Sequence, residues 1–221
     1  MTLMGQWYAN TDGQFVADLN AFSSHPDEKG CASVKEPADT AEVVPEWLAR
    51  AAAFRAEGGE RLLLDRDGGT VARLQPGAKP VKRSTMASEV TGVPVVTDET
   101  RAELNAVAAP LPANLTAATS ATLLGKWKPD PMPQGTQEPG PFAEFLADGK
   151  WTGSDGCNGQ GGRWLSGPNG SLLATQGPMT LIGCAGAPIG QWMTEARRAG
   201  FDGQTLVLLD GAGKEVGRLV E

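Results

Sequence analysis

Histidine and cysteine are scarce in this chain. Its 221 residues include one histidine, His25, and three cysteines. A cysteine nucleophile needs a general base within hydrogen-bonding distance, and a zinc site needs four ligands at suitable spacing. His25 lies beside Pro26 in a polar stretch, in a different part of the sequence from the last two cysteines. The sequence therefore predicts no catalytic, cofactor-binding or metal-binding residues, and no enzyme.

Long apolar runs and an excess of positive charge are also missing. No stretch approaches the roughly 18 apolar residues of a transmembrane helix, and residues 1–20 lack the basic and apolar regions of a secretory signal. The net charge of −7 gives no electrostatic reason to bind nucleic acid or an anionic membrane. Taken as it stands, the sequence predicts a soluble cytoplasmic monomer with an unknown protein or small-molecule partner.

Glycine and proline, in contrast, are abundant and the chain contains an internal repeat. The 29 glycines and 16 prolines suit a chain with many turns. Residues 47–74 align without gaps with residues 192–219, and ten of the paired residues are identical. Residues 5–17 match residues 162–174 in the same way. Each copy is predicted to hold a short helix after a proline and then two apolar strands around a turn, which is the pattern of a β-hairpin.

The first copy lacks its beginning, because nothing in it corresponds to residues 122–161. Either the first unit is a fragment, or Met1 is not the natural start. We favour the second interpretation, since half a β-domain would expose strand edges and an open apolar face. A lost upstream segment would also have room for an export signal. In that case we expect the protein in the cell envelope or outside the cell.

Three regions follow from the repeat. Residues 1–76 are predicted to form a partial unit, and residues 122–221 a complete one. Between them, residues 77–121 are predicted to form a linker rich in proline, alanine and threonine. A short helix is predicted at residues 97–107, where Thr97 or Asp98 would cap its first turn.

A series of motifs in residues 122–221 is typical of a known family. The region opens with Leu124-Gly-Lys-Trp127 and continues through an apolar strand to a Gly-x-x-Gly-Cys-Asn turn at residues 153–158. A further cysteine, a short helix and a Leu-x-Leu-x-Asp hairpin come after it. In this order the motifs resemble the META (HslJ-like) domain family. The resemblance implies a mainly β fold, a small antiparallel β-barrel-like domain with one short helix, and a place among bacterial envelope lipoproteins or stress-associated proteins without an established catalytic role.

The turn and the cysteines have structural interpretations. Gly153 and Gly156 are expected to permit positive φ and close backbone approach, and Asn158 to bond its own backbone. Cys157 and Cys184 are predicted to form a disulfide, which would contribute about 3.5 kcal/mol on the chain-entropy estimate. The alternative is two buried free thiols. In the first copy Cys31 corresponds to Cys184, and the counterpart of Cys157 would precede Met1.

Four tryptophans are the remaining candidates for function. They are Trp127, Trp151, Trp164 and Trp192. In a small β-domain such residues pack in the core or at its rim; the alternative is that they line the mouth of a ligand site. The sequence thus predicts a non-enzymatic binding or structural module. The alternative is a small-molecule carrier that holds an apolar ligand in the β-barrel of the C-terminal unit. A filled interior would favour the module, and a tryptophan-lined cavity the carrier.

Overall fold

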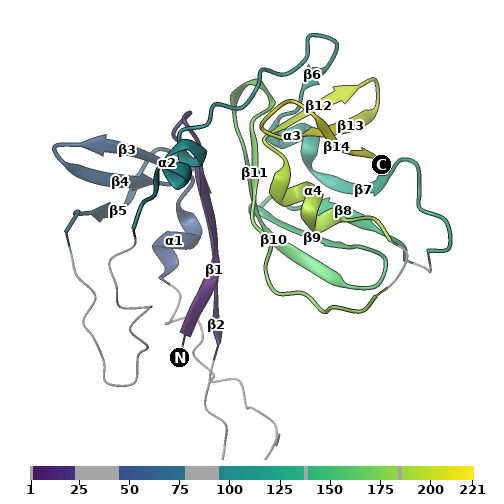
Figure 1. The fold of residues 1–221 in the computed structure, drawn as a ribbon, viewed down its shortest axis with the longest axis horizontal. Helices are drawn as coiled ribbons and strands as arrows, with labels where there is room; N and C mark the ends of the chain where they lie inside the picture. The colour runs from purple at the N-terminus through teal and green to yellow at the C-terminus, as the bar shows by residue number, and fades with distance from the viewer. Residues whose placement is uncertain (1, 23–44, 78–94, 137–138, 184–185) are drawn as a thin grey trace, which may run out of the picture.

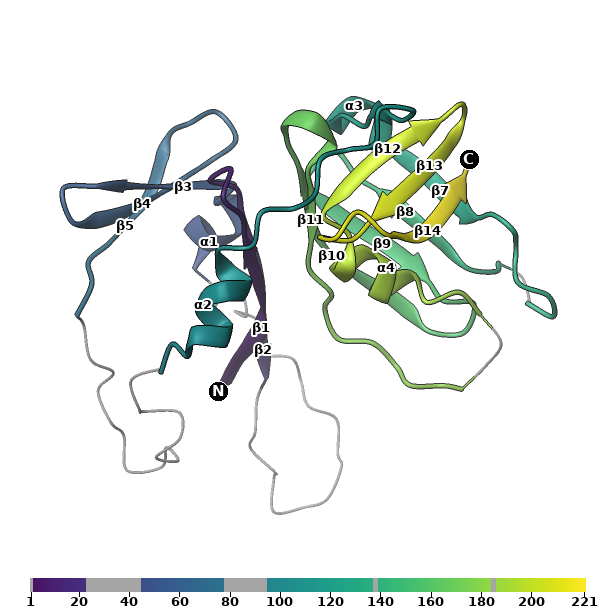
Figure 2. The ribbon, with the colours of Figure 1, turned by 45° about the horizontal axis from the view of Figure 1, so that its top comes forward.

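The chain folds into two groups of antiparallel strands that lie side by side (Figures 1 and 2). The computed structural model describes residues 2–22, 45–77, 95–136, 139–183 and 186–221. The prediction of a mainly β protein with short helices is confirmed. Within the described residues, no helix is both long enough and apolar enough to cross a membrane.

The N-terminal unit consists of a two-stranded hairpin, one short helix and a three-stranded sheet. Its elements in chain order are β1 (Thr2–Ala9), β2 (Phe15–Phe22), α1 (Glu46–Arg50), β3 (Ala53–Glu57), β4 (Glu60–Leu64) and β5 (Thr70–Leu74). An isolated bridge between Gln14 and Ala53 joins the hairpin to the sheet. The unit is therefore continuous, although its strands form two separate ladders.

The segment between the units differs from the prediction in two ways: its helix is shorter, and residues near its end form a strand. Helix α2 covers Asp98–Leu104 rather than residues 97–107, and Thr97 caps it by accepting a hydrogen bond from the Thr100 amide at 3.1 Å. Strand β6 (Thr116–Ala117) pairs with β12 (Arg198–Asp202). The end of the predicted linker therefore belongs to the sheet of the C-terminal unit.

The C-terminal unit contains one nine-stranded antiparallel sheet with the order β11-β10-β9-β8-β7-β14-β13-β12-β6. The remaining elements of this unit are α3 (Ser120–Leu123), β7 (Gly125–Pro129), β8 (Phe142–Phe145), β9 (Lys150–Ser154), β10 (Gly159–Ser166), the 3-10 turn η3 (Pro168–Gly170), β11 (Leu172–Ala174), α4 (Ile189–Glu195), β13 (Thr205–Leu209) and β14 (Glu215–Val220). The strands β7 to β10 follow one another along the chain and in the sheet, so they form a meander.

The sheet curls until its two ends approach each other. Ser171 and Arg198 form an isolated bridge, and the Leu172 amide donates to the Arg197 carbonyl at 3.1 Å. Strands β11 and β12 make no further backbone pairs with each other. The strand ladder therefore does not close into the barrel that the resemblance implies. The interior is filled by one apolar cluster, whose large fully buried members include Trp151, Trp164, Phe145, Leu123, Met193 and Leu206.

The late elements of the two units have the same register. Strands β3, β4 and β5 start at residues that lie 145 positions before the starts of β12, β13 and β14. The pairs Ala53–Leu64 and Arg198–Leu209 are equivalent under this shift. A bulge falls at Leu63/Leu64 in one unit and at the corresponding Leu208/Leu209 in the other. The repeat seen in the sequence is thus a repeat of hydrogen-bond pattern, and we call residues so aligned repeat mates.

The early hairpin also repeats, at a shift of 157. Strand β1 corresponds to β10, and the bridge between Gln14 and Ala53 corresponds to that between Ser171 and Arg198. Gly5 and Gly162 are repeat mates with one physical reason to be glycine: a Cβ would strike the carbonyl oxygen of Asp18 at Gly5 and of Thr175 at Gly162. Because Asp18 and Thr175 are themselves repeat mates, the same close approach between backbones occurs in both units.

Candidate functional site

The Gly-Cys-Asn turn joins β9 to β10 and is organised by Asp155. The Asp155 carboxylate accepts hydrogen bonds from the amides of Cys157 at 2.8 Å and Asn158 at 2.6 Å. Burial raises the pKa of Asp155, but these amides and the Asn158 side chain lower it more strongly, so it lies below its usual value. The prediction that Asn158 bonds its own backbone was therefore wrong, because the Asp155 carboxylate three residues earlier accepts the turn amides.

Asn158 instead clamps a distant segment. It is buried, and its side-chain NH₂ donates to the Asp155 carboxylate and the Ile182 carbonyl, each at 2.8 Å. Its side-chain oxygen accepts from the Ile182 amide at 2.7 Å and from the Thr180 hydroxyl at 2.7 Å. All the polar atoms of this side chain are satisfied by protein groups, as a buried amide requires. Its role is to hold residues 180–182 against the turn.

The two glycines of the turn act differently from each other. Gly156 has a φ of 112°, a conformation that favours glycine, as predicted. Gly153 has no positive φ; a Cβ there would strike the Phe142 carbonyl oxygen on the neighbouring strand β8. Its prediction thus holds for close approach and fails for φ. Cys157 lies within this turn and is not without an interaction partner. Cys184 and Cys31 lie outside the described residues, so the predicted pairing stays a prediction.

Three of the four candidate tryptophans are buried in the core. Each donates its indole N–H to a backbone carbonyl: Trp127 to Leu123 at 2.8 Å, Trp151 to Thr175 at 2.8 Å, and Trp164 to Lys150 at 2.9 Å. Trp192, on α4, packs at the rim of the core and lines a shallow hollow beside Val216 and Gly217. The structure does not bring the four rings together around one cavity.

The two units meet through repeat mates. An apolar cluster between them contains Tyr8 and Val16 from the first unit, and their mates Leu165 and Leu173 from the second. The Ser171 hydroxyl donates to the side-chain oxygen of Gln14, which is again its own mate. Equivalent patches thus face one another, which is the arrangement of a two-fold symmetric interface formed within one chain.

Sequence reasoning missed this interface, although a signal for it was present. On β1 and β10 the repeat mates Trp7 and Trp164 are each followed directly by an apolar residue, Tyr8 and Leu165. Successive residues of a strand point to opposite faces. An apolar residue directly after each tryptophan therefore indicates a second buried face.

A cleft lies on one side of the interface, and the position related to it by the two-fold arrangement is filled by a side chain. The cleft has a volume of about 840 Å³ and is lined by residues including Trp7, Leu173, Arg197 and Gly211. Gly211 is the repeat mate of Arg66. The Arg66 guanidinium donates to the Trp164 carbonyl at 3.2 Å and lies 5.8 Å from the centre of that ring. The cleft is open where glycine replaces this arginine.

Opposite charges lie across the interface. Burial raises the pKa of the Asp18 carboxyl, and the nearby Arg163 and Lys150 oppose that rise. Burial likewise lowers the pKa of the Arg163 guanidinium, and Asp18 opposes it. Arg197 stacks on Tyr8 with 5.1 Å between guanidinium and ring centre. Within the described ranges, no group of three or more histidine, cysteine or acidic residues is arranged to hold a metal.

Comparisons with known proteins do not test the resemblance to the META family. No protein-family model, no curated protein and no solved structure matches this chain.

Proposed function

We propose that this chain is a non-enzymatic, META-like binding or structural module of the bacterial envelope or of stress tolerance. The observation that carries the proposal is the filled interior of the C-terminal unit, where Trp127, Trp151 and Trp164 are buried and hydrogen-bonded to backbone. The polar groups of Asp155 and Asn158 in the Gly-Cys-Asn turn likewise form hydrogen bonds with neighbouring protein atoms. Because the family-like features build the fold, we assign the biological activity to the outer surfaces.

The envelope part of the proposal includes a disulfide between Cys157 and Cys184. Asn158 holds Ile182 through two hydrogen bonds of 2.7 and 2.8 Å, which brings the chain just before Cys184 to the residue after Cys157. Cys157 is not without an interaction partner, which is compatible with the pairing. Disulfides persist in oxidising compartments, which include the bacterial periplasm. Thiol titration of denatured, unreduced protein should find one free thiol among the three cysteines, and peptide mapping should assign it to Cys31. Three free thiols would overturn the pairing.

A genetic experiment tests the proposed function. Deletion of the gene should lower growth under detergent or oxidative envelope stress, and the intact chain should restore it. Substitutions that remove ionisable groups around the cleft, Glu195→Gln and Asp210→Asn, should restore growth equally well at equal protein levels. Loss of rescue by either single isosteric change would point to a chemical role for that group and would contradict a non-enzymatic module.

A small-molecule carrier is the second candidate, and the cleft between the units is the observation that favours it. The cleft of about 840 Å³ lies outside the filled core, with Tyr8, Val107 and Leu173 among its lining, so a carrier would use it rather than the interior of the C-terminal unit. Gly211→Arg should close it by reproducing the contact that Arg66 makes on the other side. Saturable binding of the amphipathic anionic dye 1-anilinonaphthalene-8-sulfonate to the native chain, abolished by Gly211→Arg, would support a carrier. Binding that is absent or unaffected by the substitution would exclude this cleft.

A further inference from the structure

The N-terminal unit has two strand edges that are unpaired among the described residues. Strand β1 pairs with β2 alone, and β5 pairs with β4 alone. Their counterparts β10 and β14 each have a second neighbour, β9 and β7 respectively. Those two neighbours are the outer strands of the β7–β8–β9 meander. Among the described residues, the N-terminal unit therefore has a counterpart of every strand of the curled sheet except this meander and the two-residue strand β6. Figures 1 and 2 show the two units side by side.

Two large apolar side chains mark the open side. Trp7 is 54% exposed, whereas its repeat mate Trp164 is 2% exposed. Leu74 is 42% exposed, whereas its mate Leu219 is 1% exposed. Both buried mates belong to strands that the meander flanks, and Trp164 bonds the carbonyls of Leu146 and Lys150 at its β8–β9 turn. The exposure of Trp7 and Leu74 is thus localised to the surface that a meander covers in the other unit.

We propose that this open side is a binding site for a polypeptide partner that adds three antiparallel strands, in the manner of residues 125–154. The partner is a β-strand-forming segment with an aromatic or aliphatic residue facing Trp7. It adds one strand to β1 and one to β5, by the main-chain pairing known as β-augmentation. The proposal rests on the proposed binding function and names its surface and partner class.

The C-terminal unit supplies the pairing pattern in detail. The Trp164 amide donates to the Gly149 carbonyl at 2.8 Å, so the amide of Trp7 faces the free edge of β1. On the other side, Leu219 pairs with Pro129 and Val220 with Lys128. The corresponding positions on β5 are Leu74 and the following Gln75. A partner strand therefore has unpaired main-chain groups to meet at both edges.

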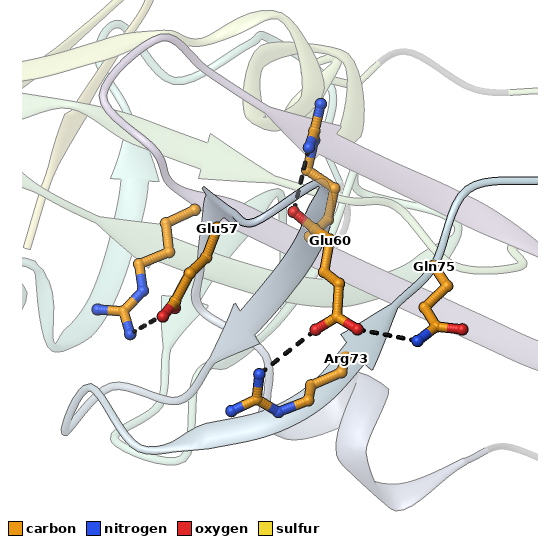
Figure 3. A network of polar contacts seen from close by, with 6 residues as sticks. Glu57, Glu60, Arg73 and Gln75 are labelled. Atoms are coloured by element: carbon orange, nitrogen blue, oxygen red, sulfur yellow. Dashed lines mark hydrogen bonds and ion pairs between the residues drawn. The ribbon is translucent and has the colours of Figure 1, made fainter.

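Polar contacts link the side chains of β4 and β5 on the outer face beside β5. Glu60 accepts from Gln75 at 2.9 Å and pairs with Arg73 at 3.4 Å (Figure 3). Both bonds lower the pKa of the Glu60 carboxyl, and the bond from Gln75 has the larger effect. Arg61 is exposed, whereas its repeat mate Leu206 is buried. The partner is accordingly expected to present a hydrogen-bond acceptor near Arg61.

Peptide binding with site-resolved amide exchange tests the proposal. The probe is a synthetic peptide of residues 122–155 of this chain, added to the full-length protein. Amide exchange should slow by about tenfold or more at the alternate amides of residues 2–9 and 70–75 that face the free edges, since each of these amides gains a hydrogen bond worth roughly 1.4 kcal/mol. The double variant Trp7→Ser/Leu74→Ser should weaken binding by at least about tenfold, through lost apolar burial. Leu181→Ser, which changes a side chain 89% exposed in the other unit, is the matched control and should not alter binding.

Several results would overturn the proposal. Equal binding of a scrambled peptide, or binding that protects only residues 125–154 of the C-terminal unit, would show another mode. Self-association that protects β1 without peptide would make a second copy the occupant. Unchanged binding by the double variant, with its fold verified by circular dichroism, would remove Trp7 and Leu74 from the site. None of these outcomes bears on the stress-tolerance experiment, so the two proposals fail separately.

Discussion

The two units have the same strand register in their common part and bury it to very different extents. Strands β3–β5 and β12–β14 share pairs and a bulge position, yet Leu74 is exposed where Leu219 is buried. Register is therefore specified within the repeated hairpins, by their own turns and alternation. Burial is specified elsewhere, by the meander β7–β9. Folding pattern and core formation are thus separable in this architecture.

The interface between the units carries a second lesson from the same comparison. Repeat mates face each other across it, yet Arg66 fills one side while Gly211 leaves a cleft on the other. The contact surface is therefore asymmetric at this pair of repeat mates. The apolar cluster at this interface also covers the outer faces of β1 and β10. The N-terminal unit is consequently supported on one face by its neighbour, and open on the other.

Truncation of the two mate tryptophans should give the largest difference between the units. Trp164→Ala removes a buried ring and its hydrogen bonds to Leu146 and Lys150, so we expect a loss of about 3–5 kcal/mol in the free energy of unfolding. Trp7→Ala removes a ring that is 54% exposed and should cost about 1 kcal/mol or less. Urea denaturation followed by circular dichroism measures both. Equal losses would show that Trp7 is covered in solution.

The hairpins of this fold could be predicted from the sequence, and the contacts that cross between segments could not. The repeated Asp65 and Asp210 indicated their turns because an aspartate accepts its bonds locally, from amides within four residues. Asn158 was assigned a local bond by the same reasoning, but it bonds Ile182, 24 positions away. No local pattern distinguishes these two uses of a short polar side chain. The Tyr8–Leu165 interface escaped for a related reason: it needs the relative placement of two sheets.

Removal of the Asn158 clamp should give the next largest effect, confined to the C-terminal unit. Asn158→Ala leaves the Ile182 amide and carbonyl and the Asp155 carboxylate without this partner, so we expect a loss of about 2 kcal/mol. Amide exchange should rise in residues 180–183 and not in β3–β5. Asn105→Ala, at an exposed position, is the control. A uniform rise across both units would mean that the clamp stabilises the whole chain rather than one segment.

Acid should weaken the same turn. The folded-state pKa of Asp155 lies below the usual 3.8 because its hydrogen bonds outweigh desolvation. A lowered pKa stabilises the fold above the unfolded value, and the gain is lost as pH falls through the folded value. Asp155→Asn should therefore cost about 1 kcal/mol near pH 7, an amount limited by solvent exposure, and the cost should shrink as the pH falls through the lowered folded-state pKa. Unfolding curves from pH 2.5 to 7 measure the difference. A gap between variant and native protein that is independent of pH would contradict this assignment.

Asp18, at the interface, should respond to pH in the opposite sense and with the smallest magnitude. Burial raises its pKa above 3.8 against the opposing charges of Arg163 and Lys150, so the stabilising contribution is complete below about pH 3.8 and is lost as pH rises through the folded value. Its repeat mate Thr175 carries no charge. Asp18→Asn should leave stability at pH 7 unchanged or higher by about 0.5 kcal/mol, because solvent screens a half-exposed carboxylate. The same unfolding series measures it. A clear loss at pH 7 would show that attraction to Arg163 outweighs desolvation, and that the charge pair, rather than the apolar mates, joins the two units.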